Sequence, residues 1–392
     1  MNKIRVLWIS DGVIPTGFSR VSHSIIKYLP KDKYEILHLA INYDGDPHPF
    51  NHKIYTAKNK GDIYGTNRIK EFSKAGVDLI FILNDLWITT MYLEEIKNVF
   101  KENIPPVVAY FPVDAKGYDS EWFRHFDIVK EAVVYTKFGY DVVKEEAPRT
   151  FDFKIVPHGV DTSIFYKMDK TREELKKEFF PPREDFEDSF IVLNANRNQP
   201  RKRIDIAIKG FALFSENKPF NVKYYHHAGI SDVGWDVLKL TAKLKKLGMD
   251  KRLVLTSFER GVQRVTDEKL NMIYNCTDIG LNTSMGEGFG LPNVEHATTG
   301  APQIVSGNSA SLELFQDCGL IIPPIMELEF ERVQTTGSLV TAEAVAEKLE
   351  IMYNSPELRK ELSEKSLAKF LSDKYRWENI AKQWDEIFES VI

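Results

Sequence analysis

Basic side chains gather at a predicted strand-to-helix turn in the second half of the chain. The segment NANRNQPRKRIDIAI (194–208) places Arg197 and Lys202 just past the carboxyl end of an apolar strand-like run. Open α/β sheets bind ligands at this edge, and a guanidinium fork beside a compact ammonium suits phosphate oxygens. We therefore predict that Arg197 and Lys202 hold an anion, the alternative being a solvated surface charge run. The flanking Arg201 and Arg203 are expected to be solvated or paired with acidic residues.

A glycine-rich turn, SMGEGFGLPNVE (284–295), is the second candidate for anion binding. Its proline, Pro292, stands where the first turn of a helix favours proline. The backbone N–H groups at such a start have no intrahelical partner, and glycines allow positive φ and a close approach of a ligand. The predicted donors to the anion are Gly288, Phe289, Gly290 and Leu291.

Two carboxylates bracket this turn, Glu287 in the loop and Glu295 in the predicted first turn of the helix. Either could be an ordinary helix-start acid stabilised by the helix dipole. As a pair around a glycine turn they favour recognition of sugar hydroxyls, because ionised carboxylates are pure acceptors. Carboxylates repel a phosphate, so this interpretation requires cations close by.

The first half of the chain offers weaker candidates. Gly17, in SDGVIPTGFS (10–19), could let a ligand approach the backbone, but the turn lacks GxGxxG and so disfavours a nicotinamide-dependent oxidoreductase. Asp114 follows a predicted strand, where acids also serve as helix caps. His158 follows the last strand of this half at the predicted domain joint, and we expect it to face a cleft.

The elements that must position these residues form two series of short apolar strands alternating with helices, a pattern typical of parallel sheets covered on both faces. We predict a first domain of residues 1–165 completed by a C-terminal helix at 374–392, and a second domain of residues 166–373, joined through a charged segment at 166–188. The predicted strands are 4–10, 34–41, 77–83, 106–111, 132–136 and 153–157 in the first series, then 190–195, 221–228, 252–258, 279–283, 302–306 and 319–323.

Composition narrows the function classes. The 392 residues carry a formal net charge of −5, which argues against a general nucleic-acid surface. Cys276 and Cys318 fit buried thiols in a reducing compartment, and His226 and His227 lack a third ligand at metal spacing. With no apolar stretch long enough to cross a bilayer and no signal-peptide pattern, we expect a cytoplasmic protein, with peripheral membrane contact left open.

Together these motifs resemble the retaining GT-B glycosyltransferases of family 4 (glycosyl transferases group 1). Glu287 and Glu295 match the E-x7-E motif around GFGLP, and Arg197 with Lys202 resembles the family's phosphate clamp. VPHGVD resembles the inter-domain PNGVD, with His158 in place of Asn, and YRWENIAKQW resembles the closing helix. The chain departs from the family where Thr16-Gly17 replaces Gly-Gly and where Asp114 stands near the position of a family histidine.

The resemblance implies a GT-B fold: two Rossmann-like α/β domains with parallel sheets facing across a cleft, and a C-terminal helix that crosses back to the first domain. It further implies transfer of a hexose from a nucleotide diphosphate sugar to a hydroxyl acceptor on a glycan, lipid or other molecule, without a metal or other cofactor.

The resemblance also implies residue roles. Glu287 would contact the donor sugar and Glu295 the ribose. The donor side would include Gly17 and His158, and Asp114 would serve the reaction. Our preferred donor is GDP-mannose, the alternatives being a UDP-sugar or a non-catalytic nucleotide-sugar-binding protein.

Overall fold

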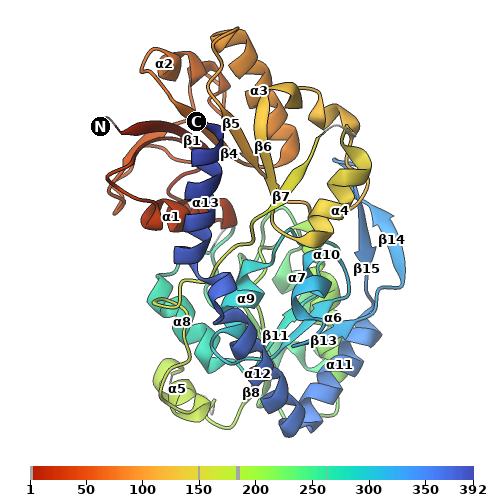
Figure 1. Cartoon of the computed structure of the whole chain (residues 1–392). Coiled ribbons are helices and arrows are strands. Elements are labelled where there is room, and N and C mark those ends of the chain that lie inside the picture. Colours follow the sequence, from red (N-terminus) through yellow and green to blue (C-terminus); the bar gives the residue numbers. More distant parts are fainter. Residues whose placement is uncertain (1–2, 149–150, 182–185, 262) are drawn as a thin grey trace. The chain divides into compact units, whose positions relative to one another are not determined.

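The computed structural model describes residues 3–148, 151–181, 186–261 and 263–392 (Figure 1). The chain divides into two compact units. The first unit is Met1–Gly159 together with Lys374–Ile392, and the second unit is Val160–Asp373. The chain therefore passes from one unit to the next after Gly159, whereas the sequence placed the boundary after residue 165.

The first unit is built on a seven-stranded sheet in the order β3-β2-β1-β4-β5-β6-β7. Every pairing in it is parallel, and the central strands are continuous apolar runs buried on both faces, as in the fully buried LIFIL of β4. The strands are β1 Ile4–Asp11, β2 Tyr34–Ile41, β3 Lys53–Thr56, β4 Leu79–Leu83, β5 Val107–Tyr110, β6 Val129–Val134 and β7 Phe153–Ile155, and the α-helices before the C-terminal segment are α1 Gly17–Tyr28, α2 Ile69–Ser73, α3 Leu86–Phe100 and α4 Lys137–Glu146.

The C-terminal helix α13 (Trp377–Val391) lies beside α1 and completes the first unit (Figure 1). Its apolar residues lie at helical spacing and are buried, and the Trp384 ring lies 4.6 Å from that of Tyr110 and 5.1 Å from that of Phe81. The chain after residue 355 does not form one continuous helix. It breaks between α12 (Pro356–Phe370) and α13 at a 3-10 turn.

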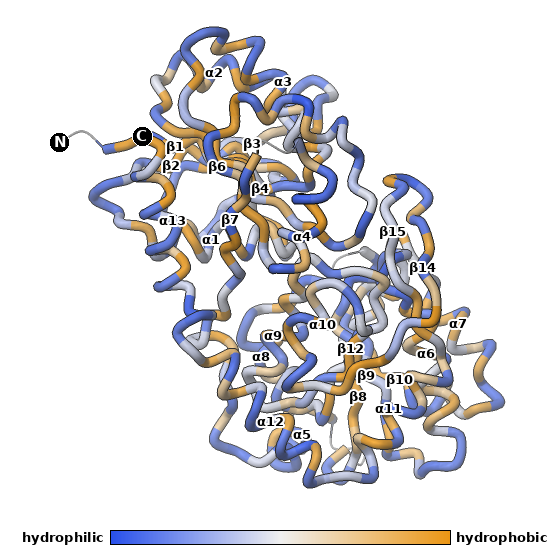
Figure 2. Tube along the Cα trace, turned by 45° about the vertical axis from the view of Figure 1, so that its right-hand side comes forward, coloured by the Kyte–Doolittle hydropathy of each residue, from blue (hydrophilic) through white to orange (hydrophobic). Residues whose placement is uncertain are grey.

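The second unit contains a six-stranded parallel sheet in the order β10-β9-β8-β11-β12-β13. This order reverses between β8 and β11, which are neighbours, and that switch point is where doubly wound sheets bind ligands. Figure 2 shows orange, hydrophobic strand segments enclosed by bluer loops. The strands are β8 Phe190–Asn194, β9 Val222–His226, β10 Leu253–Leu255, β11 Ile279–Asn282, β12 Gln303–Ser306 and β13 Leu320–Ile322, and the helices are α5 Arg172–Phe179, α6 Ile204–Ser215, α7 Val237–Lys243, α8 Asp267–Cys276, α9 Leu291–Ala297, α10 Ser309–Phe315, α11 Ala342–Asn354 and α12.

The charged segment 166–188 belongs to the second unit rather than forming a free joint between units. Thr171 caps α5 through a capping box with Glu174. The buried Lys176 ammonium contacts the Asp278 carboxylate at 2.9 Å. The segment therefore packs onto the second unit through its cations. Its polar composition alone did not indicate this packing. Residues 182–185 lie outside the described part of the chain.

Strands made of polar, partly exposed residues were not predicted from the sequence. β3 lies at the edge of the first sheet, and β14 (Met326–Glu329) pairs antiparallel with β15 (Thr336–Leu339) in a separate hairpin. Their residues lack a continuous apolar run, so hydrophobicity gave no signal. The prediction that Cys276 and Cys318 are buried is confirmed. No helix within the described ranges is long and apolar enough to cross a bilayer.

Candidate functional site

The two predicted anion-binding segments meet in the second unit. One follows β8 and the other follows β11, so both lie at the switch point of the sheet. The Thr283 hydroxyl is 3.1 Å from the carbonyl oxygen of Lys202 and 3.0 Å from that of Arg203. The Met285 N–H donates to the Arg201 carbonyl at 2.8 Å. Strand order and hydrogen bonding thus join the basic turn to the glycine-rich turn.

The centre of this meeting point is a buried ion pair. The Lys202 ammonium donates to Oε1 of Glu287, and the two residues are only 7% and 4% exposed. The Asn282 side chain donates to the same oxygen at 3.0 Å, and Arg201 Nη1 lies 3.9 Å from Oε2. The backbone N–H of Glu287 donates to Ser309 Oγ at 2.8 Å. Side chains from both turns therefore fix this carboxylate.

The charges around Glu287 keep it ionised. Burial alone would raise the pKa of the Glu287 carboxyl, but the positive charges of Lys202 and Arg201 and the hydrogen bonds from Lys202 and Asn282 outweigh burial and lower it. Buried carboxylates that remain ionised occur in functional sites as well as in structural ion pairs. Here the loop position and the glycine turn favour a functional site.

Strained backbone surrounds the pair. Arg203 (φ 48°) and Ser309 (φ 43°) both lie in the left-handed region that non-glycine residues rarely adopt. Arg203 caps α6, and its guanidinium pairs with Asp205 through two contacts of 2.9 Å, as predicted for this flanking arginine. Backbone strain of this kind costs on the order of 1–3 kcal/mol per residue and concentrates at functional sites.

One glycine of the turn adopts the positive φ that the sequence suggested. Gly290 precedes α9 with φ 84°, a conformation that glycine adopts without strain. Within the described part of the chain, the N–H groups of Gly288 and Gly290 donate no hydrogen bond to the protein. Phe289 is buried, and Leu291 begins α9. Binding of a ligand by these four residues stays a prediction.

Glu295 lies in the second turn of α9, not in the first as the sequence suggested, because the helix already begins at Leu291. Its side chain is buried and accepts a hydrogen bond from the Tyr274 hydroxyl at 3.2 Å. A dipole role at the helix start therefore does not explain this carboxylate.

Arg197 stands apart from the buried pair. Its side chain is 43% exposed and contacts Asp232 at 2.7 Å through Nε. The next residue, Asn198, is buried and donates to the carbonyl oxygens of Gly229 at 3.2 Å and Trp235 at 2.6 Å, which anchors the turn. Arg197 is thus held on a fixed turn with an exposed guanidinium.

The three candidates from the first half of the chain lie in the first unit. Gly17 is the first residue of α1, whose N-cap Thr16 accepts a hydrogen bond from the Ser19 N–H at 3.3 Å. Asp114 follows β5 and lies 3.4 Å from the Tyr118 hydroxyl. His158 is buried among aromatic rings, the nearest being Tyr135 at 4.0 Å, and burial lowers its pKa to about 3. Their roles stay predictions.

Sequence reasoning missed several residues that organise the site. Asn282 ends β11, where its position at a strand terminus was the available signal. Asp232 and Ser309 carried no signal, since each becomes significant only through a contact with a residue distant in sequence.

Comparison with solved structures shows which fold the chain adopts. The chain superposes on HepE from Anabaena, solved in complex with UDP and glucose, with a TM-score of 0.73 and 15% identity over 99% of this chain and 100% of that one. Sucrose-phosphate synthase from Thermosynechococcus elongatus gives a TM-score of 0.74 and 14% identity over 99% of both chains. WaaG, a glycosyltransferase involved in lipopolysaccharide biosynthesis, gives 0.69 and 15% over 98% and 99%.

The chain has the GT-B fold. The fold prediction is therefore confirmed. No family model matches the sequence. Among curated proteins, mannosylfructose-phosphate synthase from Agrobacterium fabrum is 26% identical over 215 residues, which is 50% of this chain and 44% of that protein. The match thus spans less than half the length of this relative.

Proposed function

We propose that this GT-B protein is a retaining glycosyltransferase of the family 4 type, which transfers a hexose from a nucleotide diphosphate sugar to a hydroxyl acceptor. The observation that carries the proposal is the buried Lys202–Glu287 pair where the turns after β8 and β11 join at the sheet's switch point. The fold and the partial match to a curated synthase support it.

The site suits the charge separation of sugar transfer. When the bond between the anomeric carbon and the phosphate breaks, negative charge develops on the departing diphosphate. The exposed guanidinium of Arg197, the Lys202 ammonium and the amides of Gly288 and Gly290 are the groups that would stabilise it. Cationic side chains and amide dipoles would then replace a divalent metal at the diphosphate.

The two oxygens of the Glu287 carboxylate have different partners. Oε1 accepts hydrogen bonds from Lys202 and Asn282, whereas Oε2 lies 3.9 Å from Arg201 Nη1 and accepts no hydrogen bond from a residue in the described ranges. Oε2 is therefore the atom that would accept hydrogen bonds from the donor sugar. The paired cations keep the carboxylate ionised and hold its orientation, which is the preorganisation that transition-state stabilisation requires.

Other residues complete the proposal. Glu295 would accept from the ribose hydroxyls, and Gly17 and His158 would serve the donor from the first unit, with Asp114 on the acceptor side. With retention of configuration, the leaving phosphate can take the acceptor's proton on the face where the new bond forms. No dedicated side-chain base is then required.

Two donor classes compete. The sequence favours GDP-mannose, and the name of the curated relative contains a mannosyl unit. HepE was solved with UDP and with UDP-glucose, which favours a UDP-linked hexose. A non-catalytic nucleotide-sugar-binding protein would use the same contacts without turnover.

Incubation with GDP-mannose and with UDP-glucose, followed by quantification of released GDP or UDP, tests the proposal. We expect slow release from one donor by hydrolysis, accelerated when an acceptor is present. Glu287→Gln, which keeps the side chain's size but removes its charge, should retain binding and lose release. Binding of a donor without release above the Glu287→Gln level would establish the non-catalytic alternative instead.

A further inference from the structure

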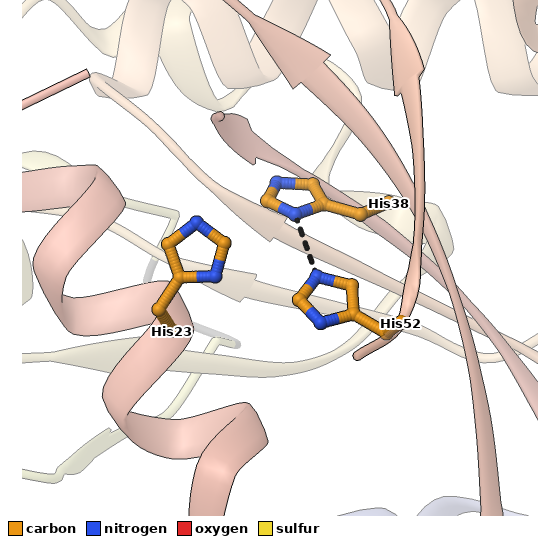
Figure 3. Close-up of side chains that lie close together, drawn as sticks. All are labelled: His23, His38 and His52. Carbon is orange, nitrogen blue, oxygen red and sulfur yellow. Dashed lines mark hydrogen bonds between the residues drawn. The ribbon is translucent and has the colours of Figure 1, made fainter. Parts of the chain in front are cut away.

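Three histidines from separate elements of the first unit face one another (Figure 3). His23 lies on α1, His38 on β2, and His52 immediately before β3. Each offers one ring nitrogen, and these three nitrogens all lie within 4.8 Å of one another. His38 is buried, and the other two rings are partly buried.

A hydrogen-bond chain fixes the tautomer of His38. Trp8 Nε1–H donates to Ser22 Oγ at 3.0 Å, and the Ser22 hydroxyl donates to Ser10 Oγ at 2.7 Å. The Ser10 hydroxyl in turn donates to the Asp11 carbonyl at 3.1 Å, so its oxygen is left to accept from His38 Nε2–H at 2.9 Å. The lone pair of His38 therefore resides on Nδ1, the nitrogen that faces His52.

The second ring is oriented in the same way. His23 Nε2–H donates to the Gly12 carbonyl at 3.1 Å, and Phe50 stacks on the His23 ring with centroids 3.3 Å apart. The remaining nitrogen, His23 Nδ1, is buried and has no hydrogen-bond partner in the described structure. Figure 3 shows a nitrogen of this ring directed toward the other two rings. A buried nitrogen without a hydrogen-bond partner, aimed at two further imidazoles, is a polar group whose presence in the interior requires an explanation.

The spacing of the third ring matches shared coordination. His38 Nδ1 and His52 Nε2 are 3.3 Å apart. Two nitrogens bound at ~2.0–2.1 Å to one tetrahedral zinc ion are separated by roughly 3.3 Å.

We propose that His23 Nδ1, His38 Nδ1 and His52 Nε2 bind a Zn²⁺ ion in the first unit, with water in the fourth position. Three imidazoles without a carboxylate suit zinc among the abundant divalent cations, and Mg²⁺ and Ca²⁺ prefer oxygen. The hydrogen bonds that His38 Nε2–H donates to Ser10 Oγ and that His23 Nε2–H donates to the Gly12 carbonyl are contacts of the kind that orient metal-bound histidines. This site is separate from the diphosphate site in the second unit and does not depend on the proposed function.

The ion would connect the loop after β2 with helix α1. That loop, residues 42–52, connects β2 to β3 and supplies His52. It lies at the carboxyl edge of the first sheet, where the Asn42 side chain already donates to Asp11 at 3.0 Å. Zinc would therefore stabilise the turn from Asp11 to Gly17, which the sequence associates with ligand binding.

Equilibrium dialysis of the whole 392-residue chain without a polyhistidine tag tests this proposal. After treatment with a chelator, the protein is dialysed against Zn²⁺, and bound metal is counted by mass spectrometry. We expect about one ion per chain, and a higher melting temperature with zinc than without it. Cobalt(II) in the same site should give the visible absorption of a tetrahedral nitrogen-ligated ion.

The variants His23→Gln and His52→Gln alter partly buried rings and should each lower zinc affinity by at least ~10-fold, and Ser10→Ala by roughly 10–100-fold through loss of the outer-shell contact. His125→Gln, a histidine of the same unit outside the cluster, is the matched control and should bind zinc like the unaltered protein. Circular dichroism establishes that each variant is folded. Uptake by folded His23→Gln and His52→Gln equal to that of the unaltered protein would overturn the proposal, as would a loss of the same size in His125→Gln.

Discussion

Replacing Lys202 with methionine tests the electrostatic arrangement of the second unit. Methionine nearly preserves the aliphatic length of the lysine side chain but removes the ammonium that contacts Glu287. Both residues are buried, so the substitution leaves a carboxylate with fewer compensating charges in a water-poor environment. Removing one partner of a buried ion pair costs about 3–5 kcal/mol of folding free energy.

The matched control is Lys365→Met. Lys365 pairs with Glu361 one turn away on α12, and both side chains are more than half exposed. Exposed pairs of this kind contribute about 0–1 kcal/mol. Subtracting the loss in free energy of unfolding measured for Lys365→Met from that of Lys202→Met removes the general effect of a Lys-to-Met change. The difference is the effect of burial.

The destabilisation of Lys202→Met should depend on pH. In the unaltered protein the pKa of Glu287 is lowered, so its contribution to stability is complete above the unfolded carboxyl value of about 4.3 and is lost as the pH falls through the lower folded value. Without Lys202, burial is opposed only by Arg201 and Asn282, and the pKa of Glu287 rises. The variant then binds more protons at this site, so its deficit is small in acid and grows as the pH increases toward 7.

Hydrogen exchange measured by mass spectrometry over a urea series, on peptides that cover β11 and α9, gives the free energy of unfolding for the second unit by itself. We expect a deficit of about 3–5 kcal/mol at pH 7 that shrinks toward pH 4. A deficit no larger than that of Lys365→Met, or one that does not change with pH, would refute the proposed arrangement of charges.

Three further changes have defined outcomes. Gly290→Ala forces a side chain into φ 84° and should cost about 1–3 kcal/mol in the same exchange measurement; an unchanged second unit would show that the turn relaxes freely. Trp384→Ala empties a fully buried position against Phe81 and Tyr110 and should cost about 3–5 kcal/mol in peptides of the first unit, leaving those of the second unaffected; equal losses in both would contradict the assignment of α13 to the first unit. Glu287→Gln should reduce turnover roughly 10²–10³-fold while the affinity for nucleotide diphosphate is kept. An equal loss of that affinity would contradict the proposed contact of Glu287 with the donor sugar.

Much of the fold could be predicted from sequence because buried parallel strands consist of continuous runs of apolar residues. FIVLN in β8 and LIFIL in β4 are examples, and each was found within a few residues of its observed bounds. The site loops followed from the rule that ligands bind beyond the carboxyl ends of such strands. Local pattern and general topology therefore located the basic and glycine-rich turns.

Pairings between distant residues could not be predicted. Lys202 and Glu287 are 85 positions apart, and whether they contact each other or a ligand depends on how the two turns are joined. The three histidines likewise come from a helix, a strand and a loop, and no spacing in the sequence indicates that they converge. The sequence supplies the residue types at these places, and only tertiary structure determines their partners.

Calorimetric titration of GDP, UDP and the corresponding nucleosides into the unaltered protein and into Arg197→Ala tests the central claim most directly. Arg124→Ala is the control, because this first-unit arginine also forms an exposed pair with an acid, Glu94. We expect one diphosphate to bind more tightly than its nucleoside, and Arg197→Ala to lose about 1.5–3 kcal/mol of diphosphate affinity while nucleoside binding is unchanged. Diphosphate binding that is equally strong in Arg197→Ala, or no stronger than nucleoside binding, would contradict a diphosphate site at these turns.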